Sequence, residues 1–412
     1  MKSRLLFSLM LLIIVFGCNK ENIQAKREPK ILQLPEKSQQ IIQQSNKFGI
    51  DLFKATSQTE ADNLMLSPLS ASTALTMLLN GCNNETYNQI HQMLGYEDMT
   101  IAEVNETYQS LVTQLLEADP EVQLALANAV WYRQDFIVKP PFLHVMDSSF
   151  NAHVEKLDFS LPSALEKING WASDNTNGKI PKVMDEISSD AVMFLMNALN
   201  FKGTWTQQFD KDQTSMKPFY PDNGSPINVS TMFGKIPVKT HASSDYRAIE
   251  LTYGRTNFSM VIIVPANSLA GFLETFDNIH WQTITTAFDD NLNTSEIDVS
   301  LPKFKFTYEK VLNDQLASLG MTDAFDSELA DLSGISDNDI FVSFVKQNTF
   351  VDVNEEGTEA AAVTIVAIDK TSAGGPQKVA FYVNRPFLYT ITEKSTGAVL
   401  FMGTVTNPSK SK

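Results

Sequence analysis

Apolar residues along this chain follow two patterns, one with the spacing of helices and one with the spacing of strands. Residues 38–57 place apolar side chains at helical intervals, Ile42 and Phe48 among them. Residues 63–81 begin as a short apolar strand. Ser67 then suits a helix N-cap, Pro68 suits the first helical position, and Gly81 suits the end. The pattern therefore predicts two helices near the start of the folded region.

Longer apolar runs predict strands over much of the remaining chain. The predicted strands cover residues 122–134, 191–205, 258–266, 295–306 and 339–353, with two or three more between 379 and 408. Helices are predicted at 164–180 and 309–320, between these strands. The mixture lacks strict β-α-β order, which indicates an α+β fold with large sheets. Residues 41–412 contain no linker and no internal repeat, so we expect one large domain there.

The first forty residues have a different composition from the rest. A basic start is followed by an apolar run, Leu5 to Phe16, which is too short to span a bilayer as a helix. The run ends in Val-Phe-Gly-Cys, which resembles a bacterial lipoprotein signal. Residues 1–17 are therefore predicted to be a signal peptide, with Cys18 as the lipidated residue. An ordinary signal peptide with a chance cysteine is the alternative.

Residues 18–40 are polar and contain two prolines, so we interpret them as a flexible tether. Acyl chains on Cys18 would hold the protein at a membrane without a spanning helix. The expected location is the cell envelope, with the anchor in the outer membrane or at the cell surface, or else the secreted fraction. Membrane contact is expected through this anchor alone.

Charge and cysteine content exclude several classes of function. The net charge is −16 and no long basic run occurs, which argues against nucleic acid as a partner. Cys18 and Cys82 are the only cysteines, so neither a disulfide framework nor a cysteine metal cluster is expected. The five histidines match no metal-ligand spacing, and no nucleophile elbow or phosphate-binding glycine loop occurs. We therefore expect no metal, no cofactor and no enzymatic activity.

Seven segments, in order along the chain, look like the serpins, a family of serine protease inhibitors. They are NLMLSPLSASTALTMLLNG, LANAVWYRQDF, FLMNALNFKGTW, LPKFKF, DLSGIS, VDVNEEGTEAAA and FYVNRPFLYTITEKSTGAVLFMGTVTNP. The resemblance extends from about residue 45 to Pro408. It implies three β-sheets with eight to nine helices and an exposed reactive loop at residues 357–379. Together with the lipoprotein signal, it indicates a bacterial member acting as a monomer.

The residues at the start of this loop support the inhibitor hypothesis independently of the family resemblance. The hinge comprises Glu355, Gly357, Thr358, Glu359, Ala360, Ala361 and Ala362. In a strand, Thr358, Ala360 and Ala362 would share one face, which is small and uncharged, while Glu359 would lie on the other. Such a segment can stay a loop until it is cut and then fit inside an existing sheet. A surface hairpin arm is the plainer alternative.

Other site residues follow from the resemblance alone. Ser67, Ser70, Asn197 and Gln347 match a polar cluster beneath the sheet that opens during inhibition. Gln347 stands where the family commonly has histidine, which predicts a cluster without a pH-sensitive member. Trp205 matches the tryptophan at the top of the sheet, where the loop inserts.

The resemblance also implies the mechanism. A serine protease attacks the loop and forms an acyl ester, and the cleaved loop inserts into the main sheet before the ester is hydrolysed. Lys370–Thr371 is the favoured reactive bond and suits a trypsin-like enzyme. Thr371–Ser372 and Ile368–Asp369 are minor candidates, and several usable bonds could extend inhibition to other classes, including cysteine proteases. The alternative function is a non-inhibitory serpin-fold binding lipoprotein.

Overall fold

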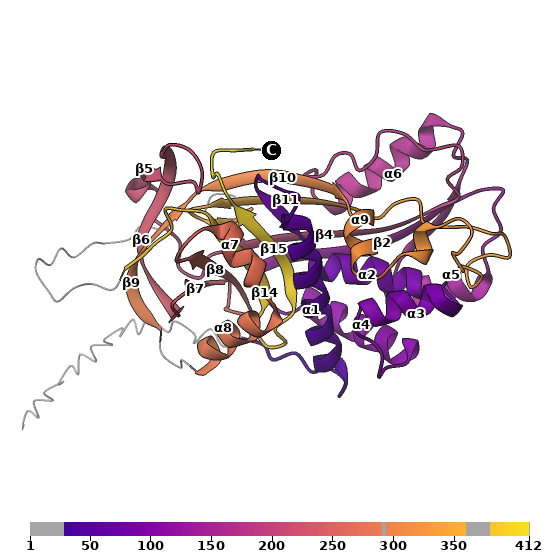
Figure 1. The fold of residues 1–412 in the computed structure, drawn as a ribbon, viewed down its shortest axis with the longest axis horizontal. Helices are drawn as coiled ribbons and strands as arrows, with labels where there is room; N and C mark the ends of the chain where they lie inside the picture. The colour runs from indigo at the N-terminus through magenta and orange to yellow at the C-terminus, as the bar shows by residue number, and fades with distance from the viewer. Residues whose placement is uncertain (1–28, 291–293, 360–379, 412) are drawn as a thin grey trace, which may run out of the picture.

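A computed structural model describes residues 29–290, 294–359 and 380–411 of the protein. Nine α-helices occur within these ranges and confirm the α+β prediction (Figure 1). They are α1 (Ser38–Ser57), α2 (Pro68–Leu79), α3 (Asn84–Met93), α4 (Ile101–Leu116), α5 (Pro140–Phe150), α6 (Pro162–Asn175), α7 (Leu269–Thr275), α8 (Asn278–Asp290) and α9 (Asn313–Ser318).

The main sheet has six strands and runs along the length of the molecule. In spatial order they are β10 (Phe304–Val311), β11 (Lys346–Asn354), β12 (Gly357–Thr358), β4 (Met193–Thr204), β2 (Val122–Arg133) and β3 (His153–Leu157). The strand β12 has only two residues and lies between β11 and β4. Among the described residues, no ladder joins β4 directly to β11.

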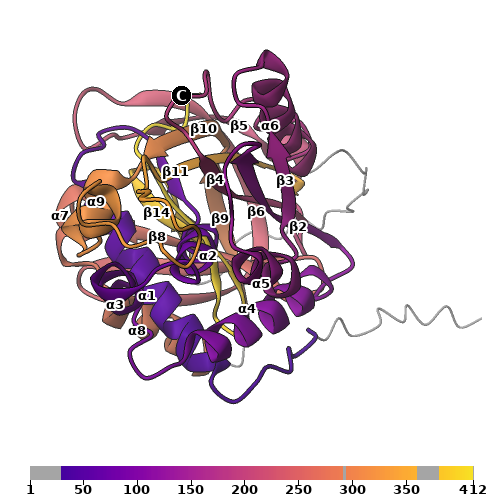
Figure 2. The ribbon, with the colours of Figure 1, turned by 90° about the vertical axis from the view of Figure 1, so that its right-hand side faces the viewer.

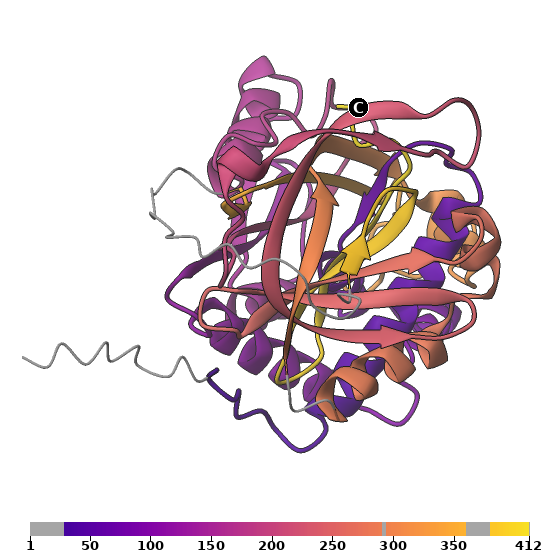
Figure 3. The same cartoon turned by 90° about the vertical axis from the view of Figure 1, so that its left-hand side faces the viewer.

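The second group of strands forms a nine-stranded network in which β6 is long enough to pair with three partners. The path is β1 (Leu64–Leu66), β15 (Val399–Val405), β14 (Phe387–Glu393), β8 (Phe258–Pro265), β7 (Tyr246–Tyr253), β6 (Ile227–Ala242), β9 (Ser295–Pro302) and β13 (Ala380–Tyr382), with β5 (Ser215–Phe219) added to β6. Figure 3 shows these strands from the end opposite the α6 side. Their buried side chains contribute to the main core together with those of the helices.

Helices cover both faces of the main sheet. α6 packs on β2 and β4 through a small apolar cluster that includes Trp131, Ala164 and Ile168. The other face of the sheet borders the main core, which contains α1 and α2. Figure 2 shows α6 apart from the group formed by α1, α3, α4 and α5. A strand entering the sheet beside β4 would therefore pass beneath α6 or beneath the segment that connects α6 to β4.

Local sequence signals explain the start of α2 well. Ser67 accepts a hydrogen bond from the backbone N–H of Ser70, and Pro68 occupies the first turn, as predicted. Cys82 follows α2 and is only 5% exposed. Burial raises the pKa of its thiol well above the ordinary range.

The predicted tether ends earlier than residue 40. Residues 1–28 lie outside the described residues, but residues 29–37 lie against the body and α1 begins at Ser38. Asn257 both donates to and accepts from the backbone of Lys30, and Gln114 does the same for Gln33. Leu32 between them is buried. These paired amide contacts and one buried side chain explain why a polar, proline-containing segment is held on the body here.

Two other boundaries were predicted wrongly. Residues 309–311 continue β10 and pair with β11, so α9 begins only at Asn313. The strand predicted from residue 339 begins at Lys346, and Phe341 and Phe344 before it are exposed. In both places the apolar spacing fits either a helix or a strand, and the pairing between β10 and β11 determines where the strands begin and end.

Candidate functional site

The hinge is already partly inside the main sheet. Gly357 and Thr358 pair with Asn354 and Val353 of β11 on one side, and with Thr204 and Gly203 of β4 on the other. The reactive loop was predicted to be exposed from residue 357. That prediction is wrong for its first two residues, because both complete a ladder between two strands.

Thr358 faces the core. Its side chain is 2% exposed, and its hydroxyl lies 2.6 Å from the Tyr253 hydroxyl. Tyr253 stacks on Trp205 with ring centroids 4.3 Å apart and an interplanar angle of 12°. This contact supplies a polar partner for the only polar group that Thr358 brings into the core.

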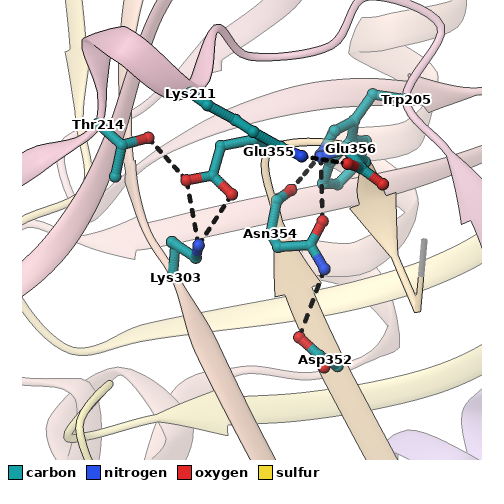
Figure 4. A network of polar contacts seen from close by, with 8 residues as sticks. All are labelled: Trp205, Lys211, Thr214, Lys303, Asp352, Asn354, Glu355 and Glu356. Atoms are coloured by element: carbon teal, nitrogen blue, oxygen red, sulfur yellow. Dashed lines mark hydrogen bonds and ion pairs between the residues drawn. The ribbon is translucent and has the colours of Figure 1, made fainter. Parts of the chain in front are cut away.

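Trp205 holds the turn that precedes β12. Its indole N–H donates to the carbonyl of Asn354 at 2.9 Å, and its backbone N–H donates to the carbonyl of Glu356 at 2.9 Å. Figure 4 shows the indole directed at Asn354. Trp205 therefore lies at the hinge end of the sheet, away from the polar cluster that includes Ser67.

The glycine at 357 is required by close packing. A Cβ built there would lie 2.0 Å from the carbonyl oxygen of Gly203 and 2.8 Å from the Cα of Thr204. Its φ of +154° is also unfavourable for other residues. Only glycine lets β12 approach β4 this closely.

Two glutamates fix the turn to neighbouring elements. The Glu355 carboxylate accepts hydrogen bonds from Lys303 at 2.8 Å and from Thr214 at 2.8 Å (Figure 4). Glu356 forms an ion pair with Lys211 of the short 3₁₀ helix Lys211–Gln213. Burial alone would raise the pKa of Glu355, but the hydrogen bonds from Lys303 and Thr214 hold it below its ordinary value.

Glu359 is the last described residue before the gap at 360–379. Its φ is +55°, and its backbone N–H donates to the carbonyl of Asp352 at 2.8 Å. The carboxylate is half-buried and accepts a hydrogen bond from Asn200 at 3.1 Å. Burial raises the pKa of Glu359, although Lys179 and Lys202 oppose this effect. β12 thus ends at Thr358, and Glu359 keeps one backbone hydrogen bond to β11 while its φ departs from that of a strand.

The predicted polar cluster is only partly assembled. Gln347 bonds the backbone of Ser67 in both directions, at 3.0 and 2.8 Å, and the Ser67 hydroxyl donates to Leu400. Ser70 joins Ser67 through the helix cap. Asn197 instead donates to Asn128, and its own Oδ1 is buried without a partner among the described residues.

Several residues that contact the hinge were not predicted from the sequence. Lys303 stands in the quoted segment LPKFKF, but nothing in that segment indicates a carboxylate partner more than fifty residues away. The roles of Tyr253, Thr214, Lys211 and Asn200 likewise depend on long-range packing. Ala360, Ala361, Ala362, Lys370, Thr371, Ser372 and Cys18 all lie outside the described residues.

Within the described ranges no group of histidine, cysteine, aspartate or glutamate residues is arranged to hold a metal ion. None of the helices in the same ranges has the length and apolar character needed to cross a membrane.

Comparison with known proteins identifies the family to which this hinge and sheet belong. The family described as "Serpin (serine protease inhibitor)" matches residues 43–408. The chain belongs to the serpin family. Human leukocyte elastase inhibitor is 33% identical over 386 residues, 90% of this chain and 100% of the relative. Iripin-5 of Ixodes ricinus is 34% identical over 369 residues, 88% of this chain and 93% of the relative.

A solved structure shares the fold over nearly the whole chain. The thermophilic serpin tengpin in its native state has a TM-score of 0.80 and 32% identity, and the match covers 92% of this chain and 96% of that one. The serpin fold predicted from the seven sequence segments is therefore confirmed.

The Glu355–Lys303 pair provides a test of what holds the hinge. Lys303→Ala leaves a buried carboxylate without its cation, so we expect a loss of about 1–3 kcal/mol of stability at pH 7 and a lower melting temperature. The pKa of Glu355 is depressed in the folded state, so its contribution exists above the ordinary pKa of 4.5 and disappears as the pH falls through the folded value. The difference from wild type should therefore shrink below about pH 4.

Lys305→Ala is the matched control, because Lys305 lies two residues away and pairs with Asp352 at 2.9 Å while 61% exposed. Its effect on melting should be small. Equal losses in the two variants would show that the Glu355 pair does not stabilise the hinge.

Proposed function

We propose that this serpin inhibits serine proteases as a suicide substrate. The serine of a protease attacks the carbonyl of Lys370, the Lys370–Thr371 amide breaks, and the leaving amine of Thr371 takes up a proton. The acylated end of the loop then moves into the main sheet as a new strand. Leukocyte elastase inhibitor, named as a protease inhibitor, is among the relatives that support this proposal.

The observation that carries the proposal is the space between β4 and β11. β12 pairs with both strands for two residues only, and no ladder joins the two strands below it among the described residues. Backbone N–H and C=O groups on both facing edges can accept another strand in the same register. Twelve residues separate Thr358 from Lys370, so full insertion would move the ester by roughly 40 Å.

The register of β12 predicts where inserted residues would lie. Counting six residues beyond each observed pair places Thr364 between Gln347 of β11 and Asn197 of β4. All three side chains would share the core face of Thr358. The Thr364 hydroxyl could then donate to the unpartnered Oδ1 of Asn197. Insertion would thereby complete the polar cluster that is only partly assembled in the described structure.

We also propose that the N-terminus is lipid-anchored through Cys18. Twelve residues separate Cys18 from Lys30, the first docked residue, and an extended chain of this length spans roughly 40 Å. An anchored molecule would therefore stay close to the bilayer, at the cell envelope. The protein is proposed to act as a monomer, without cofactor or catalytic activity of its own.

Thr358→Arg tests the insertion step. Thr358 is already buried in the uncleaved protein, so an arginine there should first expel the hinge from the sheet. Its entry during insertion would then bury a charge beside Tyr253, at a cost of about 3–5 kcal/mol, while the cleavage site in the loop would be unchanged. The variant should therefore be cut by trypsin as a substrate and form little covalent complex on a denaturing gel. Thr358→Ser, which keeps the hydroxyl, should still form the complex. Full complex formation by Thr358→Arg would rule out insertion from this hinge.

Lys370→Ala tests the reactive bond. Lys370 is the only basic residue between Gly357 and Gln377, so its loss should abolish the complex with trypsin. Mass spectrometry of the released C-terminal peptide should find Thr371 at its start. A peptide beginning at Ser372 would assign the bond to Thr371–Ser372, and one beginning at Asp369 would assign it to Ile368–Asp369.

Cys18→Ala tests the anchor. Cells fed a labelled fatty acid should label the wild type, and the variant should carry no label and leave the membrane fraction. Equal labelling of both proteins would contradict lipidation at Cys18.

A further inference from the structure

Glu359, in the hinge, has a left-handed backbone conformation that is unusual for its residue type. Among the described residues, five that are not glycine have a positive φ: Asn84, Asn151, Asn177, Thr256 and Glu359. Asparagine adopts this conformation readily, whereas glutamate and threonine do so at a cost. Such residues persist where surrounding contacts hold them. The contacts of Glu359 therefore indicate what keeps the chain bent at this point.

One buried side chain contacts two of these five residues. The Asn200 carboxamide donates to Glu359 Oε1 at 3.1 Å and accepts a longer hydrogen bond from Asn177 Nδ2 at 3.4 Å. Asn200 lies on β4 and is 5% exposed. Glu359 ends the described hinge, and Asn177 lies in the turn that follows α6. A single carboxamide thus joins the loop hinge to the end of α6.

The turn after α6 also reaches the opposite side of the space between β4 and β11. The Lys179 ammonium lies 5.0 Å from the ring centroid of Phe350 on β11. Further along the same connection, Lys346 of β11 donates to the carbonyl of Val183 at 2.9 Å. The connection is therefore attached to β4 through Asn200 and to β11 through Phe350 and Lys346, across the path of an inserting strand.

We infer that Asn200 is a positioning residue that couples the bend at Glu359 to the turn ending α6, so that the first step of loop insertion loosens this turn. The inference rests on the proposed inhibitory function. The Asn200 contact links the hinge to the turn after α6, and both would move during the proposed insertion.

The order of events follows from the register. For β12 to lengthen, Glu359 must give up its positive φ and become extended between Lys202 and Asp352. Its carboxylate would then stay on the face of Asn200 but shift away from that amide to a position directly opposite Lys202. The Asn200 amide would then be a buried donor without its acceptor, which favours rearrangement of the side chain and of its bond to Asn177. Ala361 would arrive next, between Asn200 and Phe350, at the two points where the turn is attached.

Hydrogen exchange of the uncleaved protein tests this coupling without a protease. The readout is the exchange of amides 178–180, which donate to Ser173, Thr176 and the Thr176 hydroxyl. Glu359→Ala should raise their exchange about 2- to 10-fold, the effect of losing one hydrogen bond. Glu359→Gln keeps an acceptor oxygen and should change it little. Exchange at Asn151, which caps α5, is the internal control and should stay constant.

A double-mutant cycle identifies Asn200 as the link. Asn200→Ala should itself raise exchange of the turn, and adding Glu359→Ala should then have no further effect. The inference is overturned if Glu359→Ala leaves the turn unchanged, or if its effect is equally large without Asn200. A wild type that forms no covalent complex with trypsin would instead overturn the proposed function, while leaving this coupling in the uncleaved protein intact.

Discussion

Backbone hydrogen bonding between β4 and β11 is the constraint on which the rest of this structure depends. A strand inside a sheet normally satisfies its N–H and C=O groups on both edges. Among the described residues, only the two residues of β12 pair with both β4 and β11. The remaining facing edges can be completed by one more strand. The proposed insertion of the loop would give this sheet a more fully paired arrangement.

Contacts at the hinge end of the sheet hold β12 and the turn before it. Trp205 and Tyr253 form the stacked platform on which Thr358 rests. Glu355 is held by Lys303, so the turn before β12 is attached at several points. Glu359 then has a positive φ instead of the extended conformation of a strand residue. The contacts of Glu355 before β12 and this bend at Glu359 after it bound the two residues of β12 in the described structure.

Sequence patterns predicted the fold class and the start of α2. They did not predict strand bounds and side-chain contacts that depend on residues far away in the sequence. The helix cap at Ser67 could be predicted from neighbouring residues. The family resemblance could be recognised from motifs that occur in order along the chain. The strand character of residues 309–311 follows from pairing with β11, and the docking of residues 29–37 follows from Asn257 and Gln114, which lie far away in sequence. Lys303 and Tyr253 were missed for the same reason. A charge or hydroxyl in a strand does not reveal which distant hinge residue it will contact.

The buried thiol of Cys82 bears on how this protein behaves in oxidising surroundings. The thiolate is the form that attacks disulfides and reacts with oxidants. Burial at the end of α2 raises the pKa of the Cys82 thiol far above neutrality, and its Sγ donates to the carbonyl of Leu78. Thiol exchange and oxidation at Cys82 are therefore suppressed while the body stays folded. In the proposed mechanism, ester formation with a protease would meet no competing sulfur chemistry from this residue in oxidising surroundings.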